Sequence, residues 1–493
     1  MNHIHRWANA HPEKLALIYE DTPISYANFA RKIDAACAFF KKHELPAGHI
    51  AILLVANLLD GWTLGLALRA LGLTTISVQS IGQAEALNLT GVACVVVTAR
   101  ERQFHRLEGK SMEGARVIIV EHLADSDAAA GAAARMEISV FGDHIMYTSG
   151  TTGTYKKVLI DGARDEARYD WWIRSFSYDD KTVFHIHKFG LWTAAGFGYP
   201  CAVWQAGGCV IFDQRQDHLK SLFRHGVTHT FLVPSMVKAV LASQRTEPRQ
   251  NFEVAVAGGF LSLNLAQEVV RRLTNSLKIV YGASECIAML RSSFESVDDL
   301  FWLVPYDGRV IQVVDDKGNE LPCGSEGFLR IAMNFSDATE YLDDITTTKK
   351  YFVGGFFYPG DMAVKRTDGR FRILGRVDDV LNVRGHKIAV APIEDAIQRH
   401  LQVDAVCVFS GLNADGIDVL VVTIESKHQV PREKLAGIGS LNAFAPAATA
   451  FGNFQCLRFK AFPRTTNGMN KIKRAELNKQ AFSLLRANQL ARP

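Results

Sequence analysis

Short apolar runs recur along the first 300 residues of this chain, and stretches with helical character separate them. A run such as AILLVAN (51–57) has no polar alternation, so it suits a strand that is buried on both faces of a parallel sheet. Strands that alternate with helices build layered α/β folds, which bind ligands at the carboxyl ends of the strands. We expect further strands at 92–98, 115–121, 208–213, 228–234, 253–259 and 278–284.

The pattern changes after about Gly308, where the expected strands become shorter and are separated by turns. The segment MAVKRTDGRFRILG (362–375) reads as a hairpin with an Asp-Gly turn at 368–369. A smaller unit then begins near Asp378 and contains a helix, two strands and a carboxyl-terminal helix. We therefore predict an α/β fold with a large N-terminal domain of layered sheets and helices (1–377) and a smaller, mobile α+β C-terminal domain (378–493).

Composition argues against several classes of protein. The 493 residues carry a net charge of only +4, which gives no reason to expect a nucleic-acid partner. The eight cysteines form no CxxC pair, and this favours reduced thiols in the cytoplasm over disulfides or a zinc site. The first 20 residues lack the apolar core of a signal peptide, and Asp60 and Arg69 interrupt the most apolar window. We expect a cytoplasmic protein without a membrane span.

A stretch rich in glycine and hydroxyl residues, YTSGTTGTYKKV (147–158), follows a short apolar run. Gly150 and Gly153 let the backbone turn and bring its N–H groups close to an anion. Lys156 adds a positive charge, and four side chains add hydroxyl donors: Thr148, Ser149, Thr151 and Thr152. The spacing is not that of a Walker loop, which argues against a common kinase or GTPase. Taken alone, the stretch is also compatible with a flexible surface loop.

The segment YGASE (281–285) ends one of the predicted strands. Tyr281 offers a flat ring on which a purine can stack, and the small residues after it allow a sugar to approach closely. Glu285 offers a carboxylate that can hold a divalent cation. The alternative is an ordinary junction between a strand and a loop, with a solvated glutamate.

Three further residues carry charges that suit a nucleotide. Asp361 and Arg376 flank the predicted hairpin, which can return both to one edge, where a carboxylate accepts from ribose hydroxyls and a guanidinium holds the sugar or a phosphate. Lys471, in FPRTTNGMNKIKRAEL (462–477), precedes a basic amphipathic helix and suits a mobile lysine that reaches a phosphate. A solvated ion pair and a solvated lysine are the alternatives.

Four stretches, taken together and in this order, resemble the motifs of the adenylate-forming superfamily of acyl-CoA synthetases, adenylation domains and luciferases: 147–158, 281–285, 359–394 and 462–477. Residues 147–158 resemble its phosphate loop, 281–285 its adenine and magnesium motif, and Gly360-Asp361 its ribose motif. GRVDDVLNVRGHKI (375–388) resembles its hinge and thiol-loop motif, and 462–477 its carboxyl-terminal lysine motif. The resemblance covers nearly the whole chain and implies an AMP-forming acid–thiol ligase.

The resemblance assigns roles to individual residues. It implies that the ATP phosphates are held by Thr148, Ser149, Gly150, Thr151, Thr152, Gly153 and Lys156. Tyr281 would stack on the adenine, beside the backbone of Gly258, Gly259 and Phe260, with Gly282 and Ala283 also at the nucleotide. Ser284 would contact the α-phosphate of ATP, and Glu285 would hold Mg²⁺. Asp361 would bind the ribose with help from Arg376, and Asp378 would be the hinge. Lys471 would neutralise the charge that builds up on phosphorus. Rotation of the small domain would then replace Lys471 by the Gly385–Lys387 face.

Two departures from the family pattern affect these roles. In the phosphate loop, Tyr155-Lys156-Lys157 stands where Pro-Lys-Gly is usual, which keeps the lysine and alters the mobility of the loop. In the carboxyl-terminal motif, Met469 stands where the lysine is usual. Counting backward from the helix gives Lys-Ile-x-Arg at 471–474, so two extra residues lie in the loop and Lys471 takes the role.

The acyl pocket has a weaker signal. FHIHKFGL (184–191) resembles one wall of the family's pocket, with His187 at the histidine position as a candidate catalytic and pocket residue. Lys188 follows it and argues against an α-amino acid substrate, because the neighbouring position usually bears an aspartate in amino-acid-activating members. A buried lysine needs a partner, which suggests an acidic or hydroxyl group on the substrate. The alternative is that Lys188 turns outward or pairs with a carboxylate of the protein. The remaining wall is expected at Gly258, Gly259, Ala283, Cys286 and Ile287.

The expected reaction is the activation of a small carboxylic acid with ATP and Mg²⁺, followed by transfer of the acyl group to coenzyme A. One alternative is a stand-alone adenylation enzyme that loads the phosphopantetheine thiol of a carrier protein in trans. GHKI (385–388) resembles the members that use coenzyme A and favours the first. The other alternative, motivated by Met469 and the altered phosphate loop, is a non-catalytic protein that binds a nucleotide or an acyl adenylate.

Overall fold

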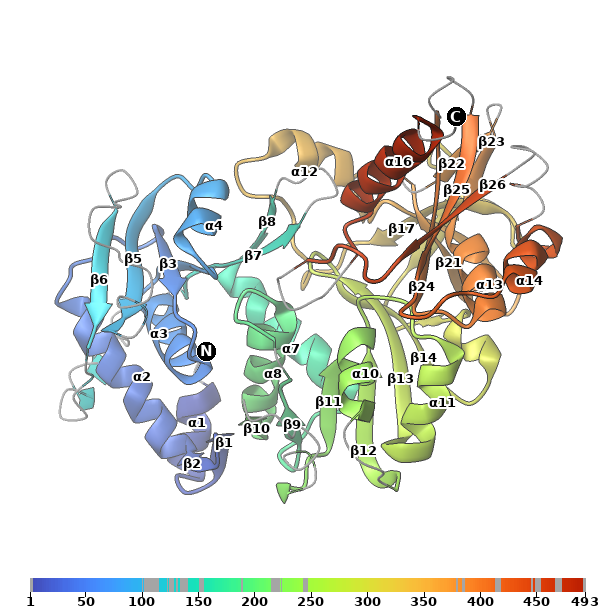
Figure 1. Cartoon of the computed structure of the whole chain (residues 1–493). Helices are drawn as coiled ribbons and strands as arrows, with labels where there is room; N and C mark the ends of the chain where they lie inside the picture. The colour runs from blue at the N-terminus through green and yellow to red at the C-terminus, as the bar shows by residue number, and fades with distance from the viewer. Residues whose placement is uncertain are drawn as a thin grey trace. The chain divides into compact units, whose positions relative to one another are not determined.

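The structure is a computed structural model, and its described residues fall into two compact units (Figure 1). Unit 1 contains Met1–Arg309 and Ala332–Phe357, and unit 2 contains Val310–Ile331 and Tyr358–Pro493. The predicted boundary at Asp378 stays a prediction. The described residues are 3–99, 101, 115–121, 123, 128–129, 132–133, 141–149, 155–187, 189–213, 222, 224–242, 247–377, 380–383, 386–412, 418–444, 447, 454–465 and 472–490.

The first sheet of unit 1 has six strands in the order β6-β5-β3-β4-β7-β8. Neighbours are parallel from β6 to β7, and β8 runs antiparallel to β7. All five residues of β3 are buried, as expected for an apolar run covered on both faces. The strands are β3 (Ile50–Leu54), β4 (Thr74–Ser77), β5 (Val92–Thr98), β6 (Arg116–Val120), β7 (His144–Ser149) and β8 (Tyr155–Ile160).

The second sheet of unit 1 has nine strands in the order β15-β14-β13-β12-β11-β9-β10-β1-β2. The run from β13 to β1 is parallel, and antiparallel strands lie at both edges. The apolar runs of the sequence therefore predicted the layered α/β fold correctly. The strands are β1 (Leu15–Tyr19), β2 (Thr22–Ser25), β9 (Val183–His185), β10 (Cys209–Phe212), β11 (His229–Leu232), β12 (Arg249–Val256), β13 (Thr274–Ala283), β14 (Ile287–Ser293) and β15 (Val304–Pro305).

Two helices of unit 1 connect its sheets. α3 (Leu58–Ala70) contacts β3 and β4, α2 (Tyr26–Lys41) contacts β1 and β2, and the two helices pack on each other. They form a layer between the sheets, which explains why α3 is buried nearly all round. The other elements are α1 (His3–Ala10), α4 (Ile81–Ala86), α7 (Gly162–Phe176), the π-helix η2 (Ala194–Gly198), α8 (Tyr199–Ala206), α10 (Pro234–Ala242), α11 (Leu263–Arg272), the 3₁₀-helix η3 (Val297–Leu300), α12 (Ile345–Tyr351), β18 (Phe352–Val353) and β19 (Phe356–Phe357).

Unit 2 begins with antiparallel strands. β16 (Ile311–Val314) pairs with β17 (Glu326–Ala332), β17 with β20 (Asp361–Lys365), and β20 with β21 (Phe371–Arg376). The last pair is the hairpin that the sequence predicted. Gly369 in its turn has a φ of +84°, a conformation that glycine adopts without a steric penalty. A second hairpin joins β22 (Val380–Val383) to β23 (His386–Ala389).

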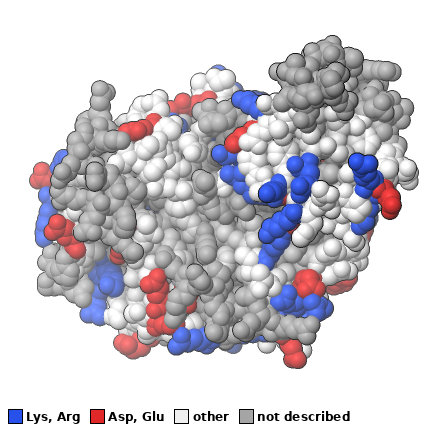
Figure 2. All heavy atoms as spheres, in the orientation of Figure 1, with Lys and Arg blue, Asp and Glu red and all other residues white. Residues whose placement is uncertain are grey.

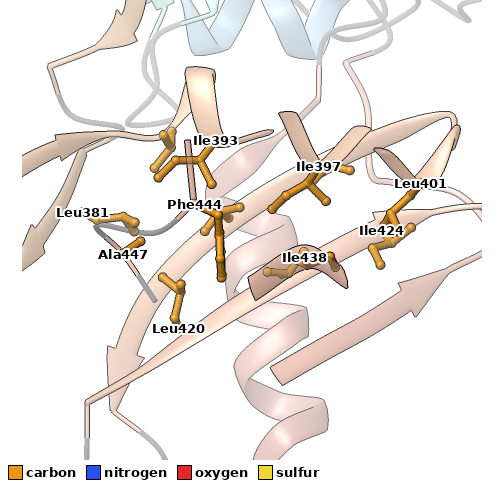
Figure 3. Close-up of a cluster of buried hydrophobic side chains, with 13 residues drawn as sticks. Leu381, Ile393, Ile397, Leu401, Leu420, Ile424, Ile438, Phe444 and Ala447 are labelled. Atoms are coloured by element: carbon orange, nitrogen blue, oxygen red, sulfur yellow. The ribbon is translucent and has the colours of Figure 1, made fainter. Parts of the chain in front are cut away.

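The rest of unit 2 is a three-stranded sheet with its own apolar core. β25 pairs antiparallel with β24 and parallel with β26. Figure 3 shows the core, in which Ile393 and Ile397 of α13 meet Leu420 of the sheet and Phe444. The elements are α13 (Ala391–Leu401), β24 (Ala405–Leu412), β25 (Asp418–Glu425), α14 (Arg432–Ala436), the 3₁₀-helix η4 (Gly437–Ser440), β26 (Phe454–Phe459) and α16 (Arg474–Leu490).

Most charged side chains lie at the surface, and Figure 2 shows Lys and Arg beside Asp and Glu on one face. Unit 1 is unusual in that it also buries several of them, and Arg69, Arg168 and Arg309 are at most 5% exposed. Buried guanidinium groups need carboxylates or carbonyls as partners, so they mark places where the fold holds its backbone tightly. Along the described residues, none of the helices is both long enough and apolar enough to cross a membrane.

Candidate active site

Three of the predicted site segments lie at the same end of the nine-stranded sheet. His187 follows β9, Gly258 to Phe260 follow β12, and Tyr281 to Glu285 complete β13 and enter its turn. Because β9, β11, β12 and β13 are parallel neighbours, their carboxyl ends point the same way. The structure therefore brings these segments together where layered α/β folds usually bind ligands.

The YGASE segment is a tight hairpin. β13 and β14 remain paired as far as Ala283 and Ile287, which leaves Ser284 to Cys286 as the turn. Ile287 has a φ of +59°, a strained value for a β-branched residue. At Gly282 a Cβ atom would lie 2.3 Å from the carbonyl oxygen of Ile287, so glycine is required there.

Three consecutive carbonyl groups in this turn each have a donor from elsewhere in unit 1. The guanidinium of Arg168 donates to Ser284, the backbone N–H of Ala338 donates to Glu285 at 2.8 Å, and Arg309 donates to Cys286. A turn held at every carbonyl has little freedom to move. Its geometry is fixed before any ligand arrives, as a preorganised site requires.

The donors behind the turn are buried and ionic. Arg309 makes two hydrogen bonds to Asp337, at 2.6 and 2.7 Å, and both side chains are 0% exposed. Arg168 lies 5.5 Å from the centre of the Trp172 ring, and burial lowers its pKa although Asp165 and Asp337 oppose this effect. Sequence reasoning missed these residues because they lie far from the motif along the chain.

Glu285, the predicted magnesium ligand, is held by a residue that the motifs did not indicate. Its side chain is 6% exposed, and its Oε1 accepts a hydrogen bond of 2.7 Å from the hydroxyl of Tyr341. Burial raises the pKa of Tyr341, and the neighbouring charge of Glu285 raises it further. The phenol therefore stays protonated and keeps donating to the carboxylate.

Tyr341 also lies against the phosphate-loop hairpin. It forms a β-bridge with Val158 of β8, and the N–H of Leu342 donates to the carbonyl of Lys157 at 2.8 Å. Within the hairpin, Thr148 pairs with Lys156. Ser149 pairs opposite Tyr155, while Gly150, Thr151, Thr152 and Gly153 lie outside the described residues. Tyr341 thus links the six-stranded sheet to the Glu285 turn.

The replaced proline and glycine of the phosphate loop have packed side chains in this chain. The ring of Tyr155 meets that of Tyr147 edge-on, with centroids 5.4 Å apart. Lys157 is 8% exposed, and its Nζ lies 3.8 Å from a carboxylate oxygen of Asp343 and 3.4 Å from the carbonyl of Asn88. Side-chain packing therefore anchors the strand that leaves the loop.

The predicted adenine wall is less enclosed. Gly258 has a φ of +78°, which favours glycine at that position. Phe260 is 42% exposed and stacks on Phe301, with ring centroids 5.4 Å apart. Tyr281 is partly exposed, and Gly259 and Ala283 lie on the same segments. The nucleotide-binding roles of these residues, and that of Ser284, stay predictions.

The predicted acyl pocket has a buried wall. His187 is 3% exposed, and the centre of its ring lies 6.1 Å from that of His185. Cys286 and Ile287 are 0% and 5% exposed, and burial raises the pKa of the Cys286 thiol well above its usual value. Lys188 lies outside the described residues. The catalytic and pocket roles of these residues stay predictions.

In unit 2 the predicted ribose residues lie together. Asp361 and Arg376 are opposite each other across β20 and β21, and Arg376 Nε lies 3.1 Å from Asp361 Oδ1. Asp361 is 6% exposed, whereas the Arg376 side chain is 49% exposed. Their roles toward a ribose stay predictions. Lys387 lies on β23, and its side chain is outside the described part of the structure. Asp378 and Lys471 lie outside the described residues.

The described residues on either side of Lys471 are firmly bound. Arg464 makes hydrogen bonds of 2.6 and 2.5 Å to the carboxylate of Glu425, and Arg474 pairs with Glu394 at 2.8 Å. Arg464 also forms a β-bridge with Ile472. The two ends of the lysine segment therefore meet in unit 2.

The chain is similar to known proteins in both sequence and fold. In sequence, the chain is 26% identical over 315 residues to acyl-coenzyme A synthetase ACSM1 of Mus musculus, covering 60% of this chain and 54% of that protein. It is 27% identical over 273 residues to the vibriobactin-specific 2,3-dihydroxybenzoate-AMP ligase of Vibrio cholerae, covering 51% of this chain and 48% of that protein. The chain thus spans about half the length of these relatives.

The fold is that of solved adenylate-forming enzymes. ATP-bound MatB from Rhodopseudomonas palustris superposes with a TM-score of 0.84 at 19% identity, over 98% of this chain and 99% of that one. The o-succinylbenzoate CoA synthetase of Bacillus subtilis, solved with its acyl adenylate, gives 0.79 at 19% identity over 97% of each chain. Residues 4–335, which include the phosphate-loop hairpin and the Glu285 turn, match the family described as AMP-binding enzyme. The chain is therefore a member of the AMP-binding enzyme family.

Proposed function

We propose that this protein activates a small carboxylic acid with ATP and transfers the acyl group to coenzyme A. In the first step the carboxylate of the acid attacks the α-phosphorus of ATP, forming an acyl adenylate while the bond to pyrophosphate breaks. In the second step a thiolate attacks the acyl carbon and AMP leaves. The observation that carries the proposal is Tyr341, which joins Glu285 to the phosphate-loop strand within one unit.

The charges at this place suit ATP and Mg²⁺. Mg²⁺ is commonly held by one or two carboxylates together with the phosphates of the substrate, and Glu285 supplies such a carboxylate. Lys156, opposite Thr148 in the hairpin, supplies a positive charge for the phosphates. Bound Mg²⁺ would neutralise phosphate charge, while Tyr341 and the donors to the turn keep the Glu285 carboxylate in place.

The predicted role of Lys471 completes the first step. A lysine beside the α-phosphate would stabilise the negative charge of the transition state. Ile472 and Arg474, which follow Lys471 in the Lys-Ile-x-Arg match, are bound in unit 2 through Arg464 and Glu394. This supports Lys471, rather than Met469, as the catalytic position.

Coenzyme A is the thiol that we propose. Support comes from the resemblance of residues 385–388 to members that use it, and from the mouse relative, which is named an acyl-coenzyme A synthetase. The Vibrio relative is named a 2,3-dihydroxybenzoate-AMP ligase, which supports an aryl acid as the second candidate. The acyl acceptor in that case would be the thiol of a carrier protein, the alternative that the sequence left open. For the acid we propose an aryl or medium-chain carboxylate with an acidic or hydroxyl group that meets Lys188.

A pyrophosphate-release assay tests the function. Aryl, aliphatic and dicarboxylic acids are supplied with ATP and Mg²⁺, with and without coenzyme A, and the products are separated by mass. We expect pyrophosphate, AMP and an acyl-CoA from at least one acid. Product found only on a phosphopantetheinylated carrier protein would favour the second candidate. Release of no pyrophosphate with any acid would contradict both and favour a binding protein.

Two variants locate the chemistry within this assay. Lys471→Ala is expected to lower adenylation about a hundredfold or more, as the loss of a group that stabilises transition-state charge should. Lys473→Ala is the matched control, because Lys473 is exposed and pairs with Glu476 at 3.4 Å. Equal losses in both variants would contradict the assignment to Lys471. Lys188→Ala should change the preference among acids, and an unchanged preference would reject the proposed role of Lys188.

A further inference from the structure

Lys156 of the phosphate-loop hairpin rests on an aromatic ring. Its Nζ lies 3.5 Å from the centroid of Tyr351 and 5.4 Å from that of Tyr341. Both distances are within the range of cation–π attraction, and 3.5 Å is close contact with the face of the ring. Neither tyrosine belongs to the motifs that predicted the site.

One of these two rings also contacts the other charged group of the site, Glu285. Tyr341 and Tyr351 meet edge-on, with centroids 5.9 Å apart and planes at 90°. The hydroxyl of Tyr341 donates to Glu285. Tyr341 therefore contacts both Lys156 and Glu285, and the lysine is drawn to the face of Tyr351. A lysine paired with the glutamate would instead use up both charges that ATP and Mg²⁺ need.

The position of Tyr351 is set by the fold. It is the last residue of α12, which begins after the N-cap Asp344, whose side chain accepts from the N–H of Thr347. Its ring packs against a cluster of buried residues that includes Met146 and Val158 of the hairpin. The Tyr351 ring thus packs on the same hairpin that carries Lys156, and this packing fixes the ring beside the lysine.

We propose that Tyr351 is a positioning residue that holds Lys156 beside the phosphate loop until a nucleotide polyphosphate takes the ammonium from the ring. The inference rests on the proposed role of Lys156 in binding ATP. A cation–π contact is weaker than charge-assisted hydrogen bonds to phosphate, so ATP can displace the ring. The ring limits the freedom that the long lysine side chain would otherwise lose on binding.

Chemical labelling of Lys156 measures the contact directly. The protein without nucleotide is treated briefly with an acetylating reagent, and the peptides that contain Lys156 and Lys350 are quantified separately by mass spectrometry. Separate quantification is needed because Lys350 also lies near Tyr351, with its Nζ 5.3 Å from the ring centroid. We expect Tyr351→Leu to raise the labelling of Lys156 several-fold, and Tyr351→Phe, which keeps the ring, to leave it near the parent level.

Kinetics distinguish positioning from catalysis. Tyr351→Leu should raise the KM for ATP on the order of threefold to tenfold, the factor that corresponds to a cation–π contact. Its kcat should change less than about twofold, because the lysine still reaches the bound phosphates. Tyr351→Phe should restore the KM of the parent. Phe352→Leu is the matched control, since it removes a neighbouring ring, and should leave the labelling of Lys156 unchanged.

Several outcomes would overturn the inference. Unchanged Lys156 labelling in Tyr351→Leu would do so, as would equal effects of Tyr351→Leu and Tyr351→Phe. If Tyr351→Leu does not fold, judged by circular dichroism, Tyr351→Met provides the same test with a flexible side chain. Absence of pyrophosphate release from the parent with every acid would contradict the proposed function alone, because labelling needs no turnover.

Discussion

At the scale of single residues, the turn that carries Glu285 depends on buried charges behind it. Arg309 donates to both carboxylate oxygens of Asp337 and to the carbonyl of Cys286. Removing one partner of a buried ion pair leaves an uncompensated charge, and the cost then exceeds that of losing an exposed pair several-fold. The site and the stability of unit 1 are therefore linked through Arg309.

Arg309→Gln is expected to lower the free energy of unfolding by about 3–5 kcal/mol, because Asp337 stays buried without its partner. Unfolding in urea, followed by tryptophan fluorescence, measures the loss. Arg291→Gln is the matched control, since Arg291 pairs at 3.6 Å with an Asp307 side chain that is 98% exposed. It should cost about 1 kcal/mol or less. Similar losses in the two variants would contradict the account of a buried pair.

The sequence indicated part of the candidate site at this scale. Glu285 and Lys156 could be identified because each lies in a short segment together with glycine. A carboxylate or a lysine beside such a turn is a recognisable pattern for a cation or a phosphate. Tyr341, Tyr351, Arg168 and Arg309 could not, since an isolated tyrosine or arginine has no local pattern that distinguishes it from a surface residue. Only the three-dimensional contacts reveal their partners.

At the scale of elements, the strands were predictable and the hairpin ends were less so. Apolar runs located the parallel strands because a strand covered on both faces has few compatible sequences. The Asp-Gly turn located the β20–β21 hairpin, since this dipeptide suits the required backbone. The β13–β14 hairpin differs, because Ile287 adopts a positive φ that no local signal predicts and that surrounding contacts must enforce.

Helix α13 in unit 2 shows a competition between two effects on one carboxyl group. Asp395 is the fifth residue of this helix, just beyond the first turn, where the helix dipole still favours the charged form only weakly. Burial instead raises its pKa to about 7, and the like charge of Glu394 contributes while Arg372 and Arg399 oppose. Burial outweighs the dipole because an exposed dipole interaction is worth only about 0.3–1 kcal/mol.

The stability of unit 2 should therefore fall as the pH rises from about 4 to 7. Asp395 has a higher pKa in the folded state than the 3.8 of an unperturbed aspartate, so the folded state binds the proton more tightly in this window. The free energy of unfolding should fall by about 1–3 kcal/mol across this pH range. This is less than the whole change in the pKa of Asp395 would give, because its side chain is partly exposed and solvent screens the charge. Urea unfolding followed by circular dichroism measures it at each pH.

Asp395→Asn should remove most of this decline. Asp368→Asn is a suitable control, because a hydrogen bond from Arg366 lowers the pKa of Asp368 to about 2 and its titration falls below the window. A decline that persists unchanged in Asp395→Asn would show that another group is responsible.

At the scale of the whole molecule, each compact unit has a core of its own. Ile52 belongs to the core cluster of the six-stranded sheet in unit 1, and Ile397 belongs to the cluster in Figure 3. Proteins with separate cores often unfold in more than one step. All seven tryptophans fall within unit 1, at 7, 62, 171, 172, 192, 204 and 302. Their fluorescence therefore follows unit 1, whereas circular dichroism follows both units.

We expect Ile397→Ala to destabilise unit 2 by about 2–5 kcal/mol, the cost of a cavity at a fully buried isoleucine. The unfolding transition followed by circular dichroism should split, or broaden toward lower urea concentrations. The urea concentration at the midpoint of the fluorescence transition should not change. Ile52→Ala changes a residue in unit 1 that is also 0% exposed. It should lower the urea concentration at the midpoint of the fluorescence transition. A fluorescence midpoint that moves equally in both variants would mean that the two units unfold as one, because a cavity in either core would then weaken the same cooperative transition.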